Sequence, residues 1–183
     1  MKATKAVVLL ALAVFSVGVA TAAAANEFYV TIEGTKQGKF KSDNQGRAHP
    51  GTMVGLEFVN EVKCPRDASS GLPTGRRQYA PVIITKRWDA ASPQLFEALV
   101  SNEMLKSVLL EFVRTRTDGQ EEVYYTITLQ NAVVVGIKQY TGEGKSGDPS
   151  APQELEEVSI SFQRIIVENK VAHTAAMDST SSR

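Results

Sequence analysis

The chain has 183 residues, with 20 basic and 20 acidic side chains. That length suits one domain with a substantial core, and a mixed, neutral charge balance excludes the basic footprint of a nucleic-acid-binding or anionic-membrane-binding protein. Cys64 is the only cysteine, which excludes an intramolecular disulfide framework and a cysteine metal cluster. We expect its side chain to be buried as a small hydrophobe.

Residues 1–25 have the three parts of a secretory signal. Lys2 and Lys5 form a basic start, residues 7–20 are an almost unbroken apolar run, and residues 21–25 are small. The apolar run is about 14 residues, shorter than the roughly 20 of a membrane-spanning helix. We therefore expect a signal-peptide-like segment that is removed, rather than a retained membrane or amphipathic helix. The mature chain would begin at Asn26 with 18 basic and 20 acidic residues.

The first part of the expected mature chain has the pattern of β-structure. Residues 28–33 alternate between apolar and polar side chains, which predicts a half-buried strand ended by Gly34. Residues 35–52 are polar and without sustained periodicity, so we expect a long excursion or a weak strand. Apolar residues return in 53–63 and predict a second strand region.

A long loop follows. Residues 65–75 hold two prolines and two glycines among Asp and Ser, a composition that cannot continue a β-ladder. Loops of this length in a compact domain are usually functional or disordered. Arg76 and Arg77 close the loop, and we expect them to make contacts within or between subunits rather than bind an anion. Residues 82–85 then predict another strand.

One short helix is predicted near residues 92–102. Ser92 fits the N-cap and Pro93 the first helical position. The apolar face that should dock on a sheet comprises Leu95, Phe96 and Leu99. About three turns of helix can cover a sheet but cannot stand alone.

The second half of the chain returns to strands. Residues 107–115 and 121–129 flank Asp118-Gly119, a dipeptide favoured in tight hairpin turns. Residues 132–137 predict a more fully apolar strand.

The C-terminal part contains one more loop and strand. Residues 142–152 are rich in Gly, Ser and Pro, and residues 158–163 alternate until Arg164, where a bulge or an exit from the core is expected. Residues 172–183 are small and polar and predict a disordered tail. Closely spaced strands with one helix indicate a single β domain over residues 26–171, a sandwich or barrel.

The sequence offers no catalytic or metal-binding pattern. His49 and His173 lack metal-ligand spacing, and no phosphate-binding glycine loop or nucleophile elbow occurs. The acidic pairs at 121–122 and 156–157 should point to opposite strand faces, as solvated or subunit-facing charges. Trp88 should pack in the core or against the helix. We therefore predict a non-enzyme without cofactor or metal.

Three stretches, together with the opening strand, carry a resemblance to a known family. The first comprises Asp67, Ser70-Gly71, Pro73, Gly75, Arg77 and Pro81. The second is Lys86-x-x-Asp89-x-x-Ser92-Pro93-x-Leu95-x-x-Ala98-Leu99. The third is Tyr125-x-x-x-Leu129-x-x-Ala132. In this order and spacing they resemble the Hcp (haemolysin-coregulated protein) family, the tube-forming proteins of type VI secretion, over about residues 27–170.

The resemblance implies a small β-barrel of two antiparallel sheets with one flanking short α-helix. It also implies homohexameric rings that stack into a tube, carry effectors in the lumen and work with spike and sheath proteins of the secretion machine. In the family the long loop reaches toward neighbouring subunits. The residues expected to make that contact are Arg66, Asp67, Gly71, Pro73, Gly75, Arg76 and Arg77.

Two departures from the family pattern bear on function. Family members often have His where Tyr79 stands, and ordinary members carry no cleavable signal because the tube assembles in the cytoplasm. With a genuine signal the protein is periplasmic or extracellular, and the alternative function is an exported Hcp-like barrel that binds a partner or ligand without forming a tube. With a later, non-ATG start, for instance near Val19, it is cytoplasmic before secretion.

Overall fold

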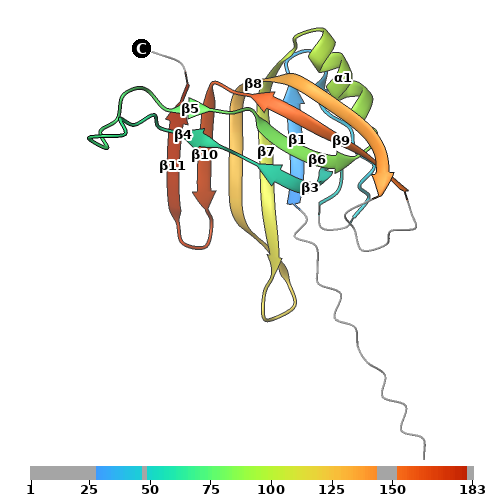
Figure 1. Ribbon diagram of the computed structural model, residues 1–183. Coiled ribbons are helices and arrows are strands. Elements are labelled where there is room, and N and C mark those ends of the chain that lie inside the picture. The colour runs from blue at the N-terminus through green and yellow to red at the C-terminus, as the bar shows by residue number, and fades with distance from the viewer. Residues whose placement is uncertain (1–27, 47–48, 144–151, 181–183) are drawn as a thin grey trace, which may run out of the picture.

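The computed structural model describes residues 28–46, 49–143 and 152–180. The elements in chain order are β1 (Phe28–Gly34), β2 (Gly38–Lys39), β3 (Met53–Val59), β4 (Val62–Lys63), β5 (Gln78–Tyr79), β6 (Val82–Arg87), α1 (Ser92–Val100), β7 (Met104–Thr115), β8 (Glu121–Glu143), β9 (Pro152–Ser161), β10 (Arg164–Asn169) and β11 (Thr174–Ser179). Strands dominate, and α1 lies at one end of the molecule next to β8 (Figure 1).

The strands close into an antiparallel barrel. Its order is β8-β7-β1-β3-β6-β9, and β9 returns to pair with β8. Closure depends on the length of β8, which pairs with β7 and β10 along its first half and with β9 along its second half. Asn131, with φ of 49°, and a register shift between Val134 and Gly136 lie where the partners change. The prediction of a small, mainly β barrel with one helix is confirmed, with one continuous curved sheet forming both sides.

The core follows from the alternation of apolar residues in the strands. Phe28, Val30 and Ile32 of β1 are each at most 2% exposed, as the sequence pattern predicted. The Phe28 ring stacks on Phe112, with centroids 5.0 Å apart. Gly55 of β3 passes directly over the Phe28 ring, so a Cβ at this position would overlap the ring. The absence of a side chain at Gly55 therefore lets β3 and β1 pack closely.

The helix differs from its prediction in three details. It ends at Val100, and Ser92 lies inside its first turn without capping it, because its hydroxyl is used in a buried network described below. Leu95 is buried and Leu99 half-buried, but Phe96 is 55% exposed. Phe96 points away because the buried face is centred on Leu95 and Ala98, three residues apart, and adjacent residues such as Leu95 and Phe96 point in different directions on a helix.

The C-terminal prediction was wrong for Thr174–Ser179. These residues form β11, which pairs with β10 from Arg164 opposite Ser179 to Asn169 opposite Thr174. Nearly all side chains of this edge strand are exposed, so its mostly small or polar residues need no core to pack against, and the one large apolar side chain, Met177, is 65% exposed. A bulge or an exit from the core was expected at Arg164. Instead β9 ends at Ser161, and a new strand, β10, begins at Arg164 and returns Ile165 to the core.

Two further strand predictions change. The two strands expected at 121–129 and 132–137 are parts of β8. The predicted loop at 142–152 lies largely outside the described residues, as does the segment 1–25.

Candidate functional site

The extended loop, residues 64–77, leaves the barrel as a narrow arm that projects past β11 (Figure 1). Its two ends are joined by the ribbon of β4 and β5, where Val62 faces Tyr79 and Lys63 faces Gln78. A further bridge joins Arg66 to Pro73. Nearly every residue of the arm is exposed. The loop is thus an ordered hairpin-like arm that rests little on its own barrel.

The tip of the extended loop has a fixed shape. One carboxylate oxygen of Asp67 accepts hydrogen bonds from the hydroxyl and backbone N–H of Ser69, at 2.6 and 3.1 Å, and of Ser70, both at 2.8 Å. These bonds, the one from the Ser69 hydroxyl first, hold the pKa of Asp67 well below its usual range. Gly71 takes a φ of +68°, which glycine adopts without strain. The tip presents Leu72, whose side chain is 65% exposed.

The base of the extended loop is fastened to β11. Arg77 donates to both carboxylate oxygens of Asp178, at 2.6 and 2.5 Å, and the Tyr79 hydroxyl donates to the same carboxylate at 2.7 Å. The Arg77 bonds, and then the Tyr79 bond, lower the pKa of Asp178. Arg77 was expected to make a contact within or between subunits, and in the described chain it makes one within the subunit.

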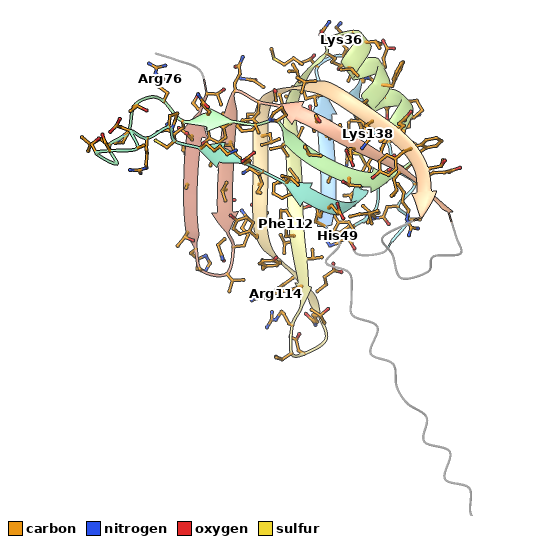
Figure 2. All side chains as sticks on the ribbon, viewed as in Figure 1. Lys36, His49, Arg76, Phe112, Arg114 and Lys138 are labelled. Carbon is orange, nitrogen blue, oxygen red and sulfur yellow. The ribbon has the colours of Figure 1, made fainter. Side chains whose placement is uncertain are left out.

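A groove of about 740 Å³ lies between the loop base and the ends of β9 and β11. Its lining residues come from the loop and from the strand ends: Cys64, Pro73, Gly75, Arg76, Arg77, Tyr79, Ala80, Ser161, Phe162, Asp178, Ser179 and Thr180. Figure 2 places Arg76 at the loop side of the molecule. Cys64 is exposed, so its predicted burial was wrong. The short ribbon that precedes Cys64 is itself exposed and offers it no apolar layer.

A second polar cluster is buried beneath the start of α1. The Lys86 ammonium lies 2.8 Å from Glu156 and 2.6 Å from Asp89. Glu156 also accepts from the Ser92 hydroxyl at 2.7 Å and from the Gln139 amide at 2.8 Å. This cluster explains the Lys86-x-x-Asp89-x-x-Ser92 spacing as a structural lock between β6, α1, β8 and β9.

Glu156 corrects the prediction that the 156–157 pair is solvated. Its side chain is fully buried, whereas Glu157 is partly exposed and lies 3.6 Å from Lys138. A cavity that Lys86 lines has a volume of about 10 Å³, room for about one water molecule. The cluster can therefore hold elements together but has no space for a substrate.

Glu103 is a buried carboxylate that the sequence did not reveal. It accepts from the backbone N–H groups of Lys36 and Gln37, at 2.6 and 2.9 Å, and from the Gln37 amide at 2.9 Å. Burial raises its pKa, but the bonds from Gln37 and Lys36 outweigh burial and leave the pKa lowered. Gly34 leaves the room that the Glu103 carboxylate occupies.

His49 and Trp88, two further candidates from the sequence, have structural partners. The His49 ring stacks on Tyr29, with centroids 3.9 Å apart, and its Nε2 lies 3.5 Å from Glu121. Trp88 was predicted to lie in the core or against the helix, but it is 41% exposed and its indole N–H donates to the carbonyl of Leu155 in β9. Within residues 28–46, 49–143 and 152–180, no three His, Cys, Asp or Glu side chains group as metal ligands. In the same residues no helix is long and apolar enough to cross a membrane.

The structure thus brings all seven predicted contact residues onto one arm or its base, namely Arg66, Asp67, Gly71, Pro73, Gly75, Arg76 and Arg77. Sequence reasoning missed Leu72 and Asp178. An apolar residue inside a Pro- and Gly-rich polar loop was an available signal for Leu72. No local pattern could connect Asp178 to a loop 101 residues away.

The comparisons with known proteins agree with this architecture. The family model described as "Type VI secretion system effector, Hcp" matches residues 29–168. The "Major exported protein" of Pseudomonas aeruginosa is 37% identical over 159 residues, covering 82% of this chain and 92% of that protein. A solved structure of an Hcp protein superposes with a TM-score of 0.78 at 26% identity, covering 86% of this chain and 99% of that one. The secreted protein Hcp3 of Pseudomonas aeruginosa superposes with a TM-score of 0.69 at 31% identity, covering 85% and 99%.

Proposed function

This chain belongs to the Hcp family of type VI secretion proteins, and from that membership we propose that it is a structural subunit that assembles into homohexameric rings stacked as a tube. In this role it has no catalytic task. The tube is exported with, or as the carrier of, effectors, and it meets the spike and sheath proteins of the secretion machine.

The observation that carries this proposal is the extended loop. Hydrogen bonds to Asp67 order the tip of the loop. The tip is exposed and presents the apolar side chain of Leu72. An ordered arm that buries little of its own surface can pack on a neighbouring subunit without unfolding anything first, which lowers the cost of association.

Electron microscopy of the natively processed protein tests the proposal. An obligate assembly must bury on the order of 2,000 Å² or more in total at each interface, so rings should persist on dilution. A particle that stays monomeric over a wide concentration range would contradict a tube subunit.

A loop variant tests the role of the arm itself. Replacing residues 66–74 by a short Gly-Ser link should leave the melting temperature nearly unchanged, because the loop buries little apolar area. The same variant should lower ring or stack formation. Leu72→Ser, which keeps the loop length, separates the apolar contact from the length of the arm. Normal assembly of the shortened chain would show that the loop does not join subunits.

A second candidate function rests on the N-terminal sequence. The basic start at Lys2 and Lys5, the apolar residues 7–20 and the small residues 21–25 favour export before assembly. In that case the protein is a periplasmic or extracellular Hcp-like barrel that binds a partner or ligand without forming a tube. Monomeric protein in the periplasmic fraction, beside a tube-free secretion medium, would favour this second function over the first.

A further inference from the structure

The fastening of the extended loop to the C-terminal strand suggests how the loop's direction is set. Of the hydrogen bonds described for residues 64–77, the two that leave the loop both end on Asp178. Arg77 grips this carboxylate with two nitrogens, a bidentate geometry that fixes orientation as well as distance. The Tyr79 hydroxyl, just beyond the loop, donates to the same carboxylate. Three donors from the loop base therefore converge on one side chain.

Asp178, which holds the loop base, lies on a strand that is itself well ordered. β11 pairs with β10 along its whole length, and beyond it Thr180 donates its N–H to Gln163 and its hydroxyl to Phe162. The Tyr79 ring also meets Phe162 edge to face, with centroids 5.3 Å apart. Asp178 is the only partly buried residue of β11. The Asp178 side chain is 25% exposed and that of Arg77 is 59% exposed, so solvent screens the pair in part and its strength rests on the bidentate geometry and the Tyr79 bond.

We propose that Asp178 is a positioning residue that fixes the direction in which the extended loop leaves the barrel, and that the C-terminal strand thereby controls loop-mediated assembly. The control of assembly rests on the proposed function, whereas the fixing of the loop direction by Asp178 does not. Asp178 lies beyond residues 29–168, the span that the family model matches.

Losing the Asp178 carboxylate should lower the fraction of subunits whose loop points in the direction needed for assembly. Gly75 and the exposed residues around it give the loop freedom to pivot once the carboxylate is lost. Subunits whose loop points in another direction cannot bind a neighbour through it. The apparent affinity between subunits is therefore reduced in proportion to the fraction of subunits whose loop is correctly placed.

Asp178→Asn is the test, because it keeps the side-chain size and removes the charge. Trypsin cuts after Arg76 and Arg77, and its rate at low protein concentration reports the population of the loosened loop base. The processed Asp178→Asn protein should be cut there at least about threefold faster than wild type, given the strength of partly exposed ion pairs. A fluorophore attached to Cys64, the only cysteine, should show lower anisotropy in Asp178→Asn than in wild type, because the loosened loop moves more freely.

Glu168→Gln is the matched control. It makes the same charge change on the neighbouring strand β10, where Glu168 contacts Lys170 and Thr126 but not the loop. Its cleavage rate and anisotropy should equal those of wild type. Tyr79→Phe removes only the hydroxyl bond and should give an intermediate acceleration, which keeps the test valid if Asp178→Asn destabilises β11. Wild-type cleavage rates in both Asp178→Asn and Tyr79→Phe would overturn the proposal.

Ring formation separates this proposal from the proposed function. Asp178→Asn should need a higher concentration to form rings, by the factor by which the fraction of fastened loops falls. If most loops are loosened but rings form at the wild-type concentration, control of assembly by Asp178 is refuted. If wild type forms no rings, the proposed function fails while the cleavage comparison still decides whether Asp178 holds the loop.

Discussion

At the scale of single residues, Glu156 is the clearest case of a side chain whose role depends on its partners. Its carboxylate is fully buried, forms an ion pair with Lys86 and accepts hydrogen bonds from Ser92 and Gln139. Removing one member of a buried ion pair typically costs about 3–5 kcal/mol. Here Asp89 still pairs with Lys86 at 2.6 Å, but the buried Ser92 hydroxyl and the Gln139 amide lose their acceptor, so the lower end of that range is expected. Glu156→Ala should therefore lower the free energy of unfolding by that order, as measured by chemical denaturation.

Glu157→Ala is the control for this prediction. The neighbouring carboxylate is 34% exposed and pairs with Lys138, whose side chain is 71% exposed. Exposed pairs contribute about 1 kcal/mol or less. Equal losses in the two variants would show that the cluster around Glu156 is not desolvated.

Glu103 should make stability depend on acid pH. Its folded-state pKa lies below the ordinary value of 4.5, so its contribution is fully present above that value and is lost as pH falls through the folded pKa. Glu103→Gln should be less stable than wild type at neutral pH, because the amide cannot accept all three donated hydrogen bonds. The difference between the two should shrink as pH falls below about 4.

Denaturation midpoints measured from pH 7 down to about pH 2 check this sign. Glu33→Gln serves as the control, since Glu33 is exposed and forms an exposed ion pair with Lys106 at 3.0 Å. A stability difference between wild type and Glu103→Gln that stays constant with pH would contradict the role given to this carboxylate.

At the scale of elements, the helix α1 is held by a narrow apolar face. Leu95 is 1% exposed and Ala98 fully buried, whereas the next residue after Leu95, Phe96, is 55% exposed. Truncating a buried leucine to alanine costs about 2–5 kcal/mol. Leu95→Ala should reach that range in equilibrium unfolding.

Phe96→Ala provides the contrast on the same helix turn. A substitution on the exposed face should change stability by less than about 0.5 kcal/mol. A large loss on truncating Phe96 in a monomeric sample would mean that the exposed face of α1 is packed in solution.

At the scale of the whole molecule, the N-terminus decides where the protein works. We expect residues 1–25 to be removed and the mature chain to start at or within a residue or two of Asn26. The first described strand begins just beyond, at Phe28. A retained apolar run of this length would be an exposed patch and promote aggregation.

N-terminal sequencing or intact mass of protein from the native host, in separate cytoplasmic and exported fractions, checks this expectation. A chain that still carries residues 7–20 would refute removal. A short form found only in the cytoplasm would instead favour a later translation start.

The sequence by itself determined the elements whose signals are local. The alternation at 28–33, the proline at the start of α1 and the Asp118-Gly119 turn each specify structure within a few residues. The spacing of the three family-like stretches also sufficed to assign the fold class and to place the extended loop.

Only the tertiary structure decided which polar groups are buried and where the chain end goes. Ser92 and Glu156 are 64 residues apart, and Arg77 and Asp178 are 101 residues apart. A carboxylate is stable inside the barrel only if a cation and donors from other strands meet it there. Likewise, Thr174–Ser179 is a strand only because β10 offers an edge to pair with. No local pattern contains these partners, since they are brought together by closure of the barrel.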